Sequence, residues 1–424
     1  MTRFISHNMP ARFCNFERLL ERMEANGLDG LVASTSNNVF YLSGFNALAQ
    51  KSDEPRPFAF VLSRHDPEHP ILVLPDYYLG AFSGVETWVE DFRPYRGVLL
   101  PFDTQTTAET LLRFVPETAH QSPWVQRAAK HYAGDMVDAL HGALADIGLT
   151  RGRIGFDDLR LGAKIESPSR TIADAYAVLM SARSVKTPAE IQALRAATAV
   201  NRTAIESCVN AWTKGMTYRD LNHVYDRTVV DLGGHVHDPG AMVFFNGGGH
   251  DPYVSINMGN DDFELEPGMR IMFDCHGTLG LYCWDGGKTW VVGQELDVET
   301  KRLATVTADA MTEVENAMRP GARISELQAL GQSVFRKSGL AGADDVFVFF
   351  HGLGLSHLDQ ELMGSVEGSA TGDWILESDM LVATHILYPG GDRERMWLED
   401  IGLITATGAE PFFGWDFMPH VPTT

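Results

Sequence analysis

Two ten-residue segments of the chain repeat one pattern, and this repeat constrains the fold. LEPGMRIMFD (265–274) and LESDMLVATH (376–385) start 111 residues apart and share Leu, Glu and Met at matching positions. Each segment contains an apolar run typical of a buried strand and ends in a polar residue, Asp274 in the first and His385 in the second. The repeat predicts two similar half-domains that face each other and bring Asp274 and His385 together.

The 424-residue chain is too long for one typical hydrophobic core, which predicts two domains. Residues 1–182 mix helix-like and strand-like stretches, so we expect an α/β domain there. The boundary is marked by Thr187-Pro188-Ala189-Glu190, a capping box that predicts a helix start. Residues 183–424 are expected to form the second domain, of mixed helices and strands.

Short apolar runs bounded by polar residues or Pro give the expected strands, and apolar residues at helical spacing give the expected helices. Strands are expected near 29–35, 58–63, 69–75, 153–158, 268–274, 281–293, 379–388 and 397–408, and helices near 16–28, 300–318 and 324–338.

The chain is strongly acidic, with 56 Asp and Glu against 34 Lys and Arg and a net charge of −22. This charge repels nucleic acid and anionic lipid, so neither is expected as a partner. The four cysteines are scattered without a CxxC pair, so we expect no disulfide framework. The N-terminus lacks the apolar core of a signal peptide, and no apolar run approaches the ~18 residues of a membrane span. A cytoplasmic protein is therefore expected.

Two carboxylates are expected to lie close together in the second domain. Asp274 closes an apolar strand, and Asp285 follows eleven residues later, after a turn that contains Gly277 and Gly280. An antiparallel pair of strands would place both carboxylates on one face, where they repel each other unless a cation or a proton lies between them. A metal ion is the natural resolution.

Further metal-type residues lie near other apolar strands of the same domain. His351 opens the glycine-rich segment HGLGLSH (351–357), and Glu399 lies inside an apolar strand. With His385 from the repeat, they complete a candidate ligand set of mixed oxygen and nitrogen donors, which suits Mn, Fe, Co or Zn. The set consists of Asp274, Asp285, His351, His385 and Glu399.

Two more histidines are candidates for proton transfer. His250 follows three glycines in FFNGGGHDPY (244–253), a composition that indicates a loop folded tightly around a ligand. His357 ends the glycine-rich segment that begins at His351. For both histidines the alternative to proton transfer is a purely structural role.

The order of these motifs along the chain resembles that of metallopeptidase family M24. This "pita-bread" fold family includes methionine aminopeptidase, aminopeptidase P, prolidase and creatinase. The matching motifs are Asp274 with Asp285 eleven residues on, His351-Gly352-Leu353-Gly354, Glu399-Asp400 and the loop that ends at His250. The resemblance implies an N-terminal α/β domain and an α+β catalytic domain with pseudo-two-fold symmetry. It also implies a homodimer and one or two divalent metal ions per chain.

The chain departs from the family pattern at four positions. His385 stands where the peptidases carry Glu, and His357 lies one residue before the family's second histidine. Lys288 and Trp397 replace two arginines. These changes argue against an ordinary broad-specificity peptidase.

Hydrolysis of a C–N bond is the first functional hypothesis, with an Xaa-Pro peptide or a small amide such as creatine or ectoine as the substrate. The metal would activate water, Glu399 would accept a proton, and His250 and His357 would assist the oxyanion or the leaving nitrogen. The alternatives are a metal-free, creatinase-like site that uses His250, a lyase acting on dimethylsulfoniopropionate, and a non-catalytic binding module. Against the lyase, position 276 is His where that type carries Asp.

Overall fold

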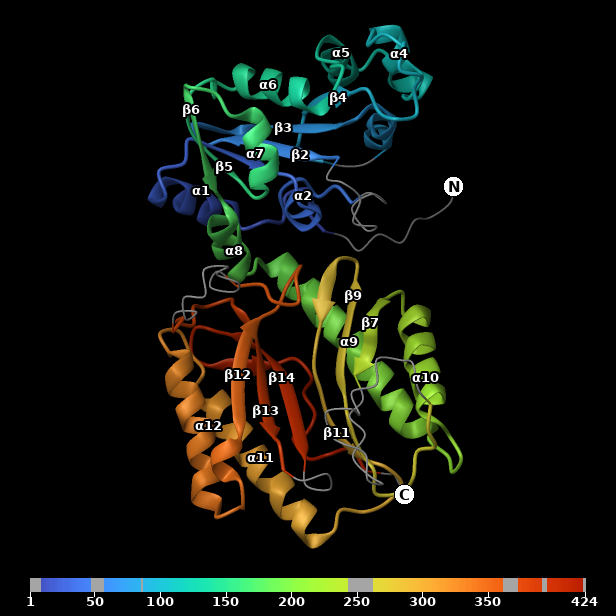
Figure 1. Ribbon diagram of the computed structural model, residues 1–424, viewed down its shortest axis with the longest axis vertical. Helices are drawn as coiled ribbons and strands as arrows, with labels where there is room; N and C mark the ends of the chain where they lie inside the picture. The colour runs from blue at the N-terminus through green and yellow to red at the C-terminus, as the bar shows by residue number, and fades with distance from the viewer. Residues whose placement is uncertain are drawn as a thin grey trace. The chain divides into compact units, whose positions relative to one another are not determined.

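The computed structural model describes residues 9–46, 57–84, 87–242, 262–360, 373–390 and 395–421. The chain divides into two compact units, Met1–Arg183 and Ser184–Thr424. Figure 1 shows the helices and strands of each unit.

The first unit is built on a six-stranded mixed sheet with the order β4-β3-β2-β1-β5-β6. Its strands are β1 (Gly30–Ala33), β2 (Ala59–Ser63), β3 (Asp66–Pro75), β4 (Asp91–Tyr95), β5 (Gly152–Phe156) and β6 (Arg170–Asp174). Its helices are α1 (Phe16–Ala25), α2 (Ser36–Ser43), α4 (Ala108–Leu112), α5 (Pro123–Lys130), α6 (Met136–Asp146), α7 (Leu159–Ile165) and α8 (Tyr176–Ser184). Helix α6 buries Leu140 and Leu144 against the strands that carry Val32, Val61 and Phe156. The predicted α/β domain is confirmed.

The second unit contains two sheets. One has the order β10-β9-β7, and the other has the order β12-β13-β14-β11-β8 with β15 paired to β14. Their strands are β7 (His235–Met242), β8 (Arg270–Met272), β9 (Asp274–Leu279), β10 (Tyr282–Trp284), β11 (Gly287–Val291), β12 (Phe347–Gly352), β13 (Leu381–Tyr388), β14 (Met396–Ile404) and β15 (Ala409–Pro411). The helices are α9 (Pro188–Ala211), α10 (Tyr218–Asp231), α11 (Val298–Ala317) and α12 (Ile324–Ser338). Helix α9 begins at the predicted capping box of Thr187 and Glu190.

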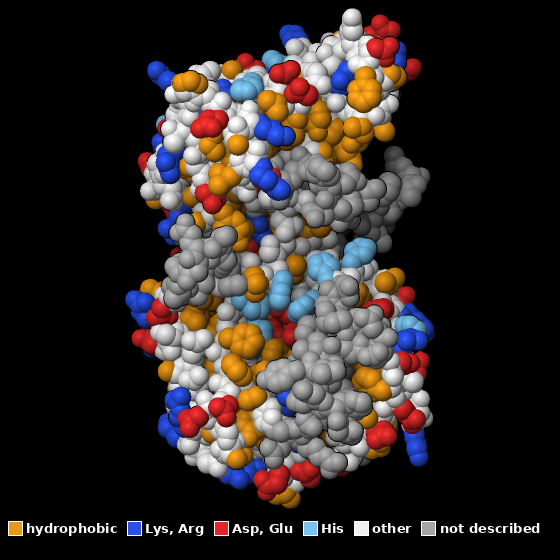
Figure 2. All heavy atoms as spheres, in the orientation of Figure 1, with side chains coloured by type: hydrophobic (Ala, Val, Ile, Leu, Met, Phe, Trp, Pro, Cys, Tyr) orange, Lys and Arg blue, Asp and Glu red, His pale blue; other side chains and the backbone are white. Residues whose placement is uncertain are grey.

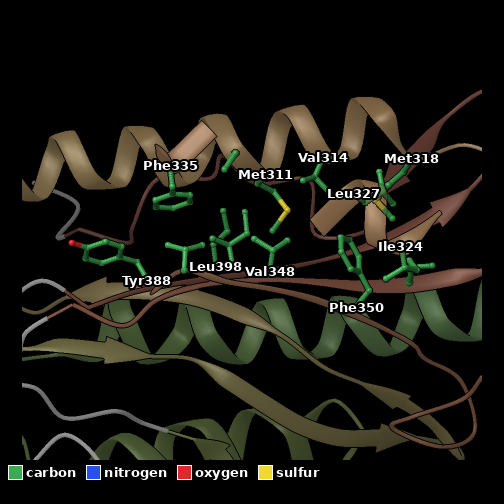
Figure 3. Packing of buried hydrophobic residues seen from close by; sticks show 14 of the residues in the cluster. Met311, Val314, Met318, Ile324, Leu327, Phe335, Val348, Phe350, Tyr388 and Leu398 are labelled. Atoms are coloured by element: carbon green, nitrogen blue, oxygen red, sulfur yellow. The ribbon is translucent and has the colours of Figure 1, made fainter. Parts of the chain in front are cut away.

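Each helix pair of this unit covers its own strands. Helices α9 and α10 bury Cys208 and Tyr225 in one core with Cys275 and Trp284 of β9 and β10. Helices α11 and α12 cover the other sheet, as Figure 3 shows for Met311, Phe335, Val348 and Leu398. The apolar faces of the strands therefore point to the helices.

The predicted internal repeat is visible in the turns before β8 and β13. The backbone N–H of Glu266 donates to Met269 Sδ at 3.2 Å, and that of Glu377 donates to Met380 Sδ at 3.3 Å. Gly268 and Asp379, again 111 residues apart, both have a positive φ, of 89° and 66°. Equivalent turns with the same unusual backbone confirm the pseudo-two-fold symmetry of an α+β domain.

Two predicted strand boundaries were wrong. Segment 281–293 is not one strand, because it breaks at Asp285 and Gly286 into β10 and β11, which belong to different sheets. Gly286 and Gly287 have φ values of 92° and 153°, which glycine adopts readily. Segment 268–274 likewise divides at Phe273, so that Asp274 starts β9 instead of ending β8. Both aspartates therefore lie where the chain passes from one sheet to the other.

Candidate metal centre

Four buried side chains of the second unit point their ligand atoms at one another. Asp285 comes from the β10–β11 junction, His351 from β12, His385 from β13 and Glu399 from β14, and their ligand atoms all lie within 4.8 Å of one another. Figure 2 shows histidine side chains gathered beside acidic ones on this unit. We call Asp285, His351, His385 and Glu399 the four-residue group.

The strand register explains why three of these residues meet. His385 of β13 lies directly opposite Glu399 of β14. Phe349 of β12 lies opposite His385. Since side chains alternate along a strand, His351 faces the same side as Phe349 and reaches the same point. Three adjacent strands thus present His, His and Glu on one face.

Glu399 and His385 form the deepest part of the group. His385 Nε2 lies 3.0 Å from Glu399 Oε1, and Glu399 is fully buried. Burial, with Asp285 and Asp274 nearby, raises the pKa of Glu399 well above its ordinary value. Burial, with His351 nearby, lowers the pKa of His385 well below its ordinary value. His385 is therefore held neutral, the form in which an imidazole nitrogen binds a metal.

Asp285 lies between three imidazoles. Its Oδ1 is 3.0 Å from His276 Nε2, and its Oδ2 is 3.3 Å from His351 Nε2 and 2.5 Å from His357 Nε2. Complete burial alone would raise the pKa of Asp285, but these three histidines hold it well below its ordinary value. Asp285 is therefore ionised, with an imidazole nitrogen close to each of its two oxygens.

The polar atoms of the four-residue group fit a divalent cation. Among the described residues, both carboxylate oxygens of Glu399 and Oδ2 of Asp285 are buried without a hydrogen bond of good geometry. Two carboxylates buried close together are costly unless a cation or a proton lies between them. Two carboxylates with two imidazoles are a donor set that suits Zn, Fe, Co or Mn.

Asp274, the fifth predicted ligand, lies next to the four-residue group. It is close enough to Glu399 to help raise the pKa of that carboxyl, and its own pKa is raised by burial. Its Oδ1 lies 3.2 Å from His276 Nε2. The carboxylates of Asp274 and Asp285 therefore face a common histidine.

His276 is the residue that sequence reasoning missed. Burial would lower its pKa, but Asp274 and Asp285 raise it to about 10. The sequence feature that could have identified His276 is its position two residues after Asp274. Two residues apart on a strand, both side chains lie on one face. The burial of β9 follows this alternation, because Asp274 and His276 are half-buried while Cys275 and Gly277 are fully buried.

The two predicted proton-transfer histidines have different outcomes. His357 reaches Asp285 from the loop after β12, and 43% of its side chain is exposed. It could therefore contact both the centre and a substrate. His250 lies outside the described residues.

Lys288 and Trp397, which stand where the family carries arginines, both make specific contacts in the structure. Lys288 donates from Nζ to the backbone oxygen of Asp416 at 2.7 Å and to its Oδ1 at 3.1 Å. Trp397 packs beside His385, with ring centroids 5.4 Å apart, and Phe349 stacks on His385 at 4.2 Å. His385 is thus fixed between aromatic rings.

The family comparisons agree with this architecture. Residues 192–406 match the model of "Metallopeptidase family M24", and residues 16–197 match that of the "Creatinase/Prolidase N-terminal domain". The chain belongs to metallopeptidase family M24. No helix in the described ranges is long and apolar enough to cross a membrane.

Individual relatives are distant. An uncharacterized peptidase of Staphylococcus aureus (strain bovine RF122 / ET3-1) is 24% identical over 242 residues, which span 57% of this chain and 65% of that relative. The prolidase of Pyrococcus furiosus has a TM-score of 0.65 at 15% identity and covers 93% of this chain and 99% of its own. The X-Pro aminopeptidase of Thermotoga maritima has a TM-score of 0.64 at 16% identity, with 96% and 99% covered. These structures share the fold over both units.

Proposed function

We propose that this chain is a metal-dependent hydrolase that cleaves a C–N bond in a small substrate, either an Xaa-Pro peptide or a small amide. The observation that carries the proposal is the four-residue group, in which two buried carboxylates and two imidazoles point their ligand atoms at one another. The M24 family model and the prolidase fold support a peptide as the first substrate class to test.

A divalent cation held by Asp285, His351, His385 and Glu399 would lower the pKa of water and polarise a substrate carbonyl. With a cation beside it, Glu399 would be held ionised in spite of its burial, and its carboxylate could accept a proton from water. His357 lies at the exposed edge of the centre, where its imidazole can give a proton to the leaving nitrogen. Phe349 and Trp397 keep the ring of His385 in place.

A substrate panel on untagged protein tests this proposal. Metal per chain is measured first, and then the protein is assayed with Xaa-Pro dipeptides, creatine, ectoine and dimethylsulfoniopropionate, with and without a chelator. We expect chelator-sensitive hydrolysis of a peptide or amide, reduced at least about 100-fold in His351→Ala. The matched control is His223→Ala on the exposed side of α10, which should leave the rate unchanged.

Three results would overturn the proposal. Hydrolysis of creatine that no chelator affects would indicate the metal-free mechanism. Release of dimethyl sulfide from dimethylsulfoniopropionate would indicate a lyase. Metal-free protein without activity on any compound of the panel would leave a binding module.

A further inference from the structure

A row of apolar side chains borders the four-residue group on the sheet that carries His385. Across the strands, His385 lies between Phe349 of β12 and Glu399 of β14. The next row, two residues along each strand, consists of Phe347, Leu387 and Trp397. Directly opposed residues share a face and side chains alternate along a strand, so both rows lie on the same face. The row with the two candidate ligands is therefore followed by a wholly apolar one. We call Phe347, Phe349, Leu387 and Trp397 the apolar border.

Two large rings of the apolar border are open to solvent. Phe347 is 57% exposed and Phe349 is 37% exposed, on the edge strand β12 of the sheet that the described strands form. Val348 and Phe350, which alternate with them, are instead buried in the core with helices α11 and α12. Figure 2 shows hydrophobic side chains beside the histidines of this unit. Exposed aromatic rings next to a group of convergent polar side chains are typical of a ligand site.

The apolar border is rigid where it meets the centre. The ring of Phe349 stacks on that of His385, with centroids 4.2 Å apart and planes at 12°. It also lies 6.2 Å from the ring of Trp397, which is almost completely buried. Since packing already fixes Phe349, little conformational freedom would be lost when a ligand covers its exposed part.

The chemistry of the apolar border decides which substrate group it accepts. All four of its side chains are uncharged and apolar, so a charged group placed against them would lose hydration without gaining a partner. An aromatic or large aliphatic group would instead remove apolar surface from water on both partners. Adjacent rows on one strand face are about 7 Å apart, a span that the side chain of a residue bound at the centre can cover.

We propose that Phe347 and Phe349 form a subsite for an aromatic or large aliphatic side chain of the substrate, next to the bond that is cleaved. This inference rests on the proposed function, because it takes the four-residue group as the place of the reaction. It narrows the substrate class to peptides and amides that carry such a side chain. Phe349 is then a specificity-determining residue, in addition to its contact with His385.

Matched dipeptides test the proposal on the metal-loaded, untagged full chain. The value of kcat/KM is measured for Phe-Pro, Leu-Pro, Ala-Pro and Lys-Pro, which differ in one side chain. We expect Phe-Pro and Leu-Pro to exceed Ala-Pro at least about tenfold, and Lys-Pro to stay within about threefold of Ala-Pro. Phe349→Ala should bring all four within about threefold of one another. Phe102→Ala, which truncates a 94% exposed phenylalanine of the first unit, should keep the preference of the unaltered chain.

The ratio between substrates separates contact with the substrate from support of His385. A variant that only loosened His385 would lower the rates on Phe-Pro and Ala-Pro equally and would leave their ratio unchanged. Phe347→Ala gives a second route if Phe349→Ala does not fold, because Phe347 is the more exposed ring. We expect it to lower the ratio at unchanged metal content. The inference is overturned if the unaltered chain does not prefer Phe-Pro to Ala-Pro, or if both variants keep its ratio.

Equilibrium binding separates this inference from the proposed function. Calorimetry gives the affinity of the metal-loaded chain for phenylalaninamide and for alaninamide, without any need for turnover. A preference for phenylalaninamide that Phe349→Ala removes, on a chain that hydrolyses no compound of either panel, would support the subsite and overturn the proposed function. Hydrolysis of dipeptides without a side-chain preference would overturn the subsite and leave the proposed hydrolase standing.

Discussion

At the scale of single residues, the most consequential departure from the family pattern is His385. It lies opposite Glu399 across the β13–β14 pair, with its Nε2 3.0 Å from the carboxylate. The peptidases of the family carry Glu at this position, so a neutral imidazole here means one negative charge fewer in the centre. We therefore expect this residue to favour metals that prefer nitrogen donors.

His385→Glu tests this role. The added carboxylate should raise the affinity for Mn²⁺ relative to Zn²⁺ by about tenfold or more, because Mn²⁺ prefers oxygen donors. The ratio is measured by equilibrating stripped protein with both metals and analysing the bound fraction. His385→Gln serves as the control, since it removes the imidazole without adding charge. An unchanged ratio in His385→Glu would contradict the assignment of His385 as a ligand.

Glu190 gives a pH prediction away from the centre. It is buried in the α9 capping box, where burial raises its pKa from 4.5 to about 7 in spite of Lys186. In this pH window the folded chain holds a proton that the unfolded chain has lost, so the contribution of Glu190 to stability falls as pH rises from 4.5 to 7.

Glu190→Gln should remove this pH dependence and keep the capping box, because Gln can also occupy that position. Relative to the unaltered chain, the melting temperature of the variant should rise by about 2–8 °C between pH 5 and pH 8. Thermal melts across this range measure the difference. The exposed Glu313→Gln provides the control. A difference that stays constant with pH would show that Glu190 does not titrate there.

At this scale the sequence named four residues whose side chains lie together in the structure, and their role as metal ligands stays a prediction. Asp285 was predicted from its spacing after Asp274, His351 from the glycine-rich segment that it opens, His385 from the repeat and Glu399 from its apolar strand. His276 was missed because a single histidine on a strand has no distinctive signal until its neighbours across the site are known. His250 lies outside the described residues, so its role stays a prediction.

At the scale of elements, the break between β10 and β11 positions Asp285. Gly287 makes this break possible, since a Cβ at this residue would lie 2.5 Å from the backbone oxygen of Phe273, and its φ is 153°. The apolar pattern of 281–293 gave no sign of the break, because both pieces are buried strands. The repeat was a better guide, since it predicted two similar half-domains, and Gly268 and Asp379 at equivalent positions both have a positive φ.

Gly287→Ala tests the importance of this break. The substitution should destabilise the chain by more than about 2 kcal/mol, because the backbone is strained and its neighbour is also backbone. Gly408→Ala, where a Cβ would meet nothing within 4 Å, should change stability by less than about 0.5 kcal/mol. Chemical denaturation measures both variants. Equal stability of the two would contradict the close approach of Phe273 and Gly287.

At the scale of the whole molecule, the fold class was predictable, while assembly was not. Alternating patterns predicted the first unit, and the internal repeat predicted the symmetry of the second. Homodimer formation stays a prediction, since it depends on surfaces that the pattern of one chain does not specify. That nucleic acid is not a partner also stays a prediction, which rests on the net charge of −22.

The most direct measurement follows hydrolysis and metal occupancy together. Stripped, untagged protein is titrated with Co²⁺ or Zn²⁺, and the rate on the best substrate of the panel is recorded at each occupancy. We predict a rate that rises from background with metal bound and that remains at background in His351→Ala. A stripped protein that hydrolyses the substrate at the full rate, or a fully loaded protein that hydrolyses nothing, would contradict a catalytic metal centre at Asp285, His351, His385 and Glu399.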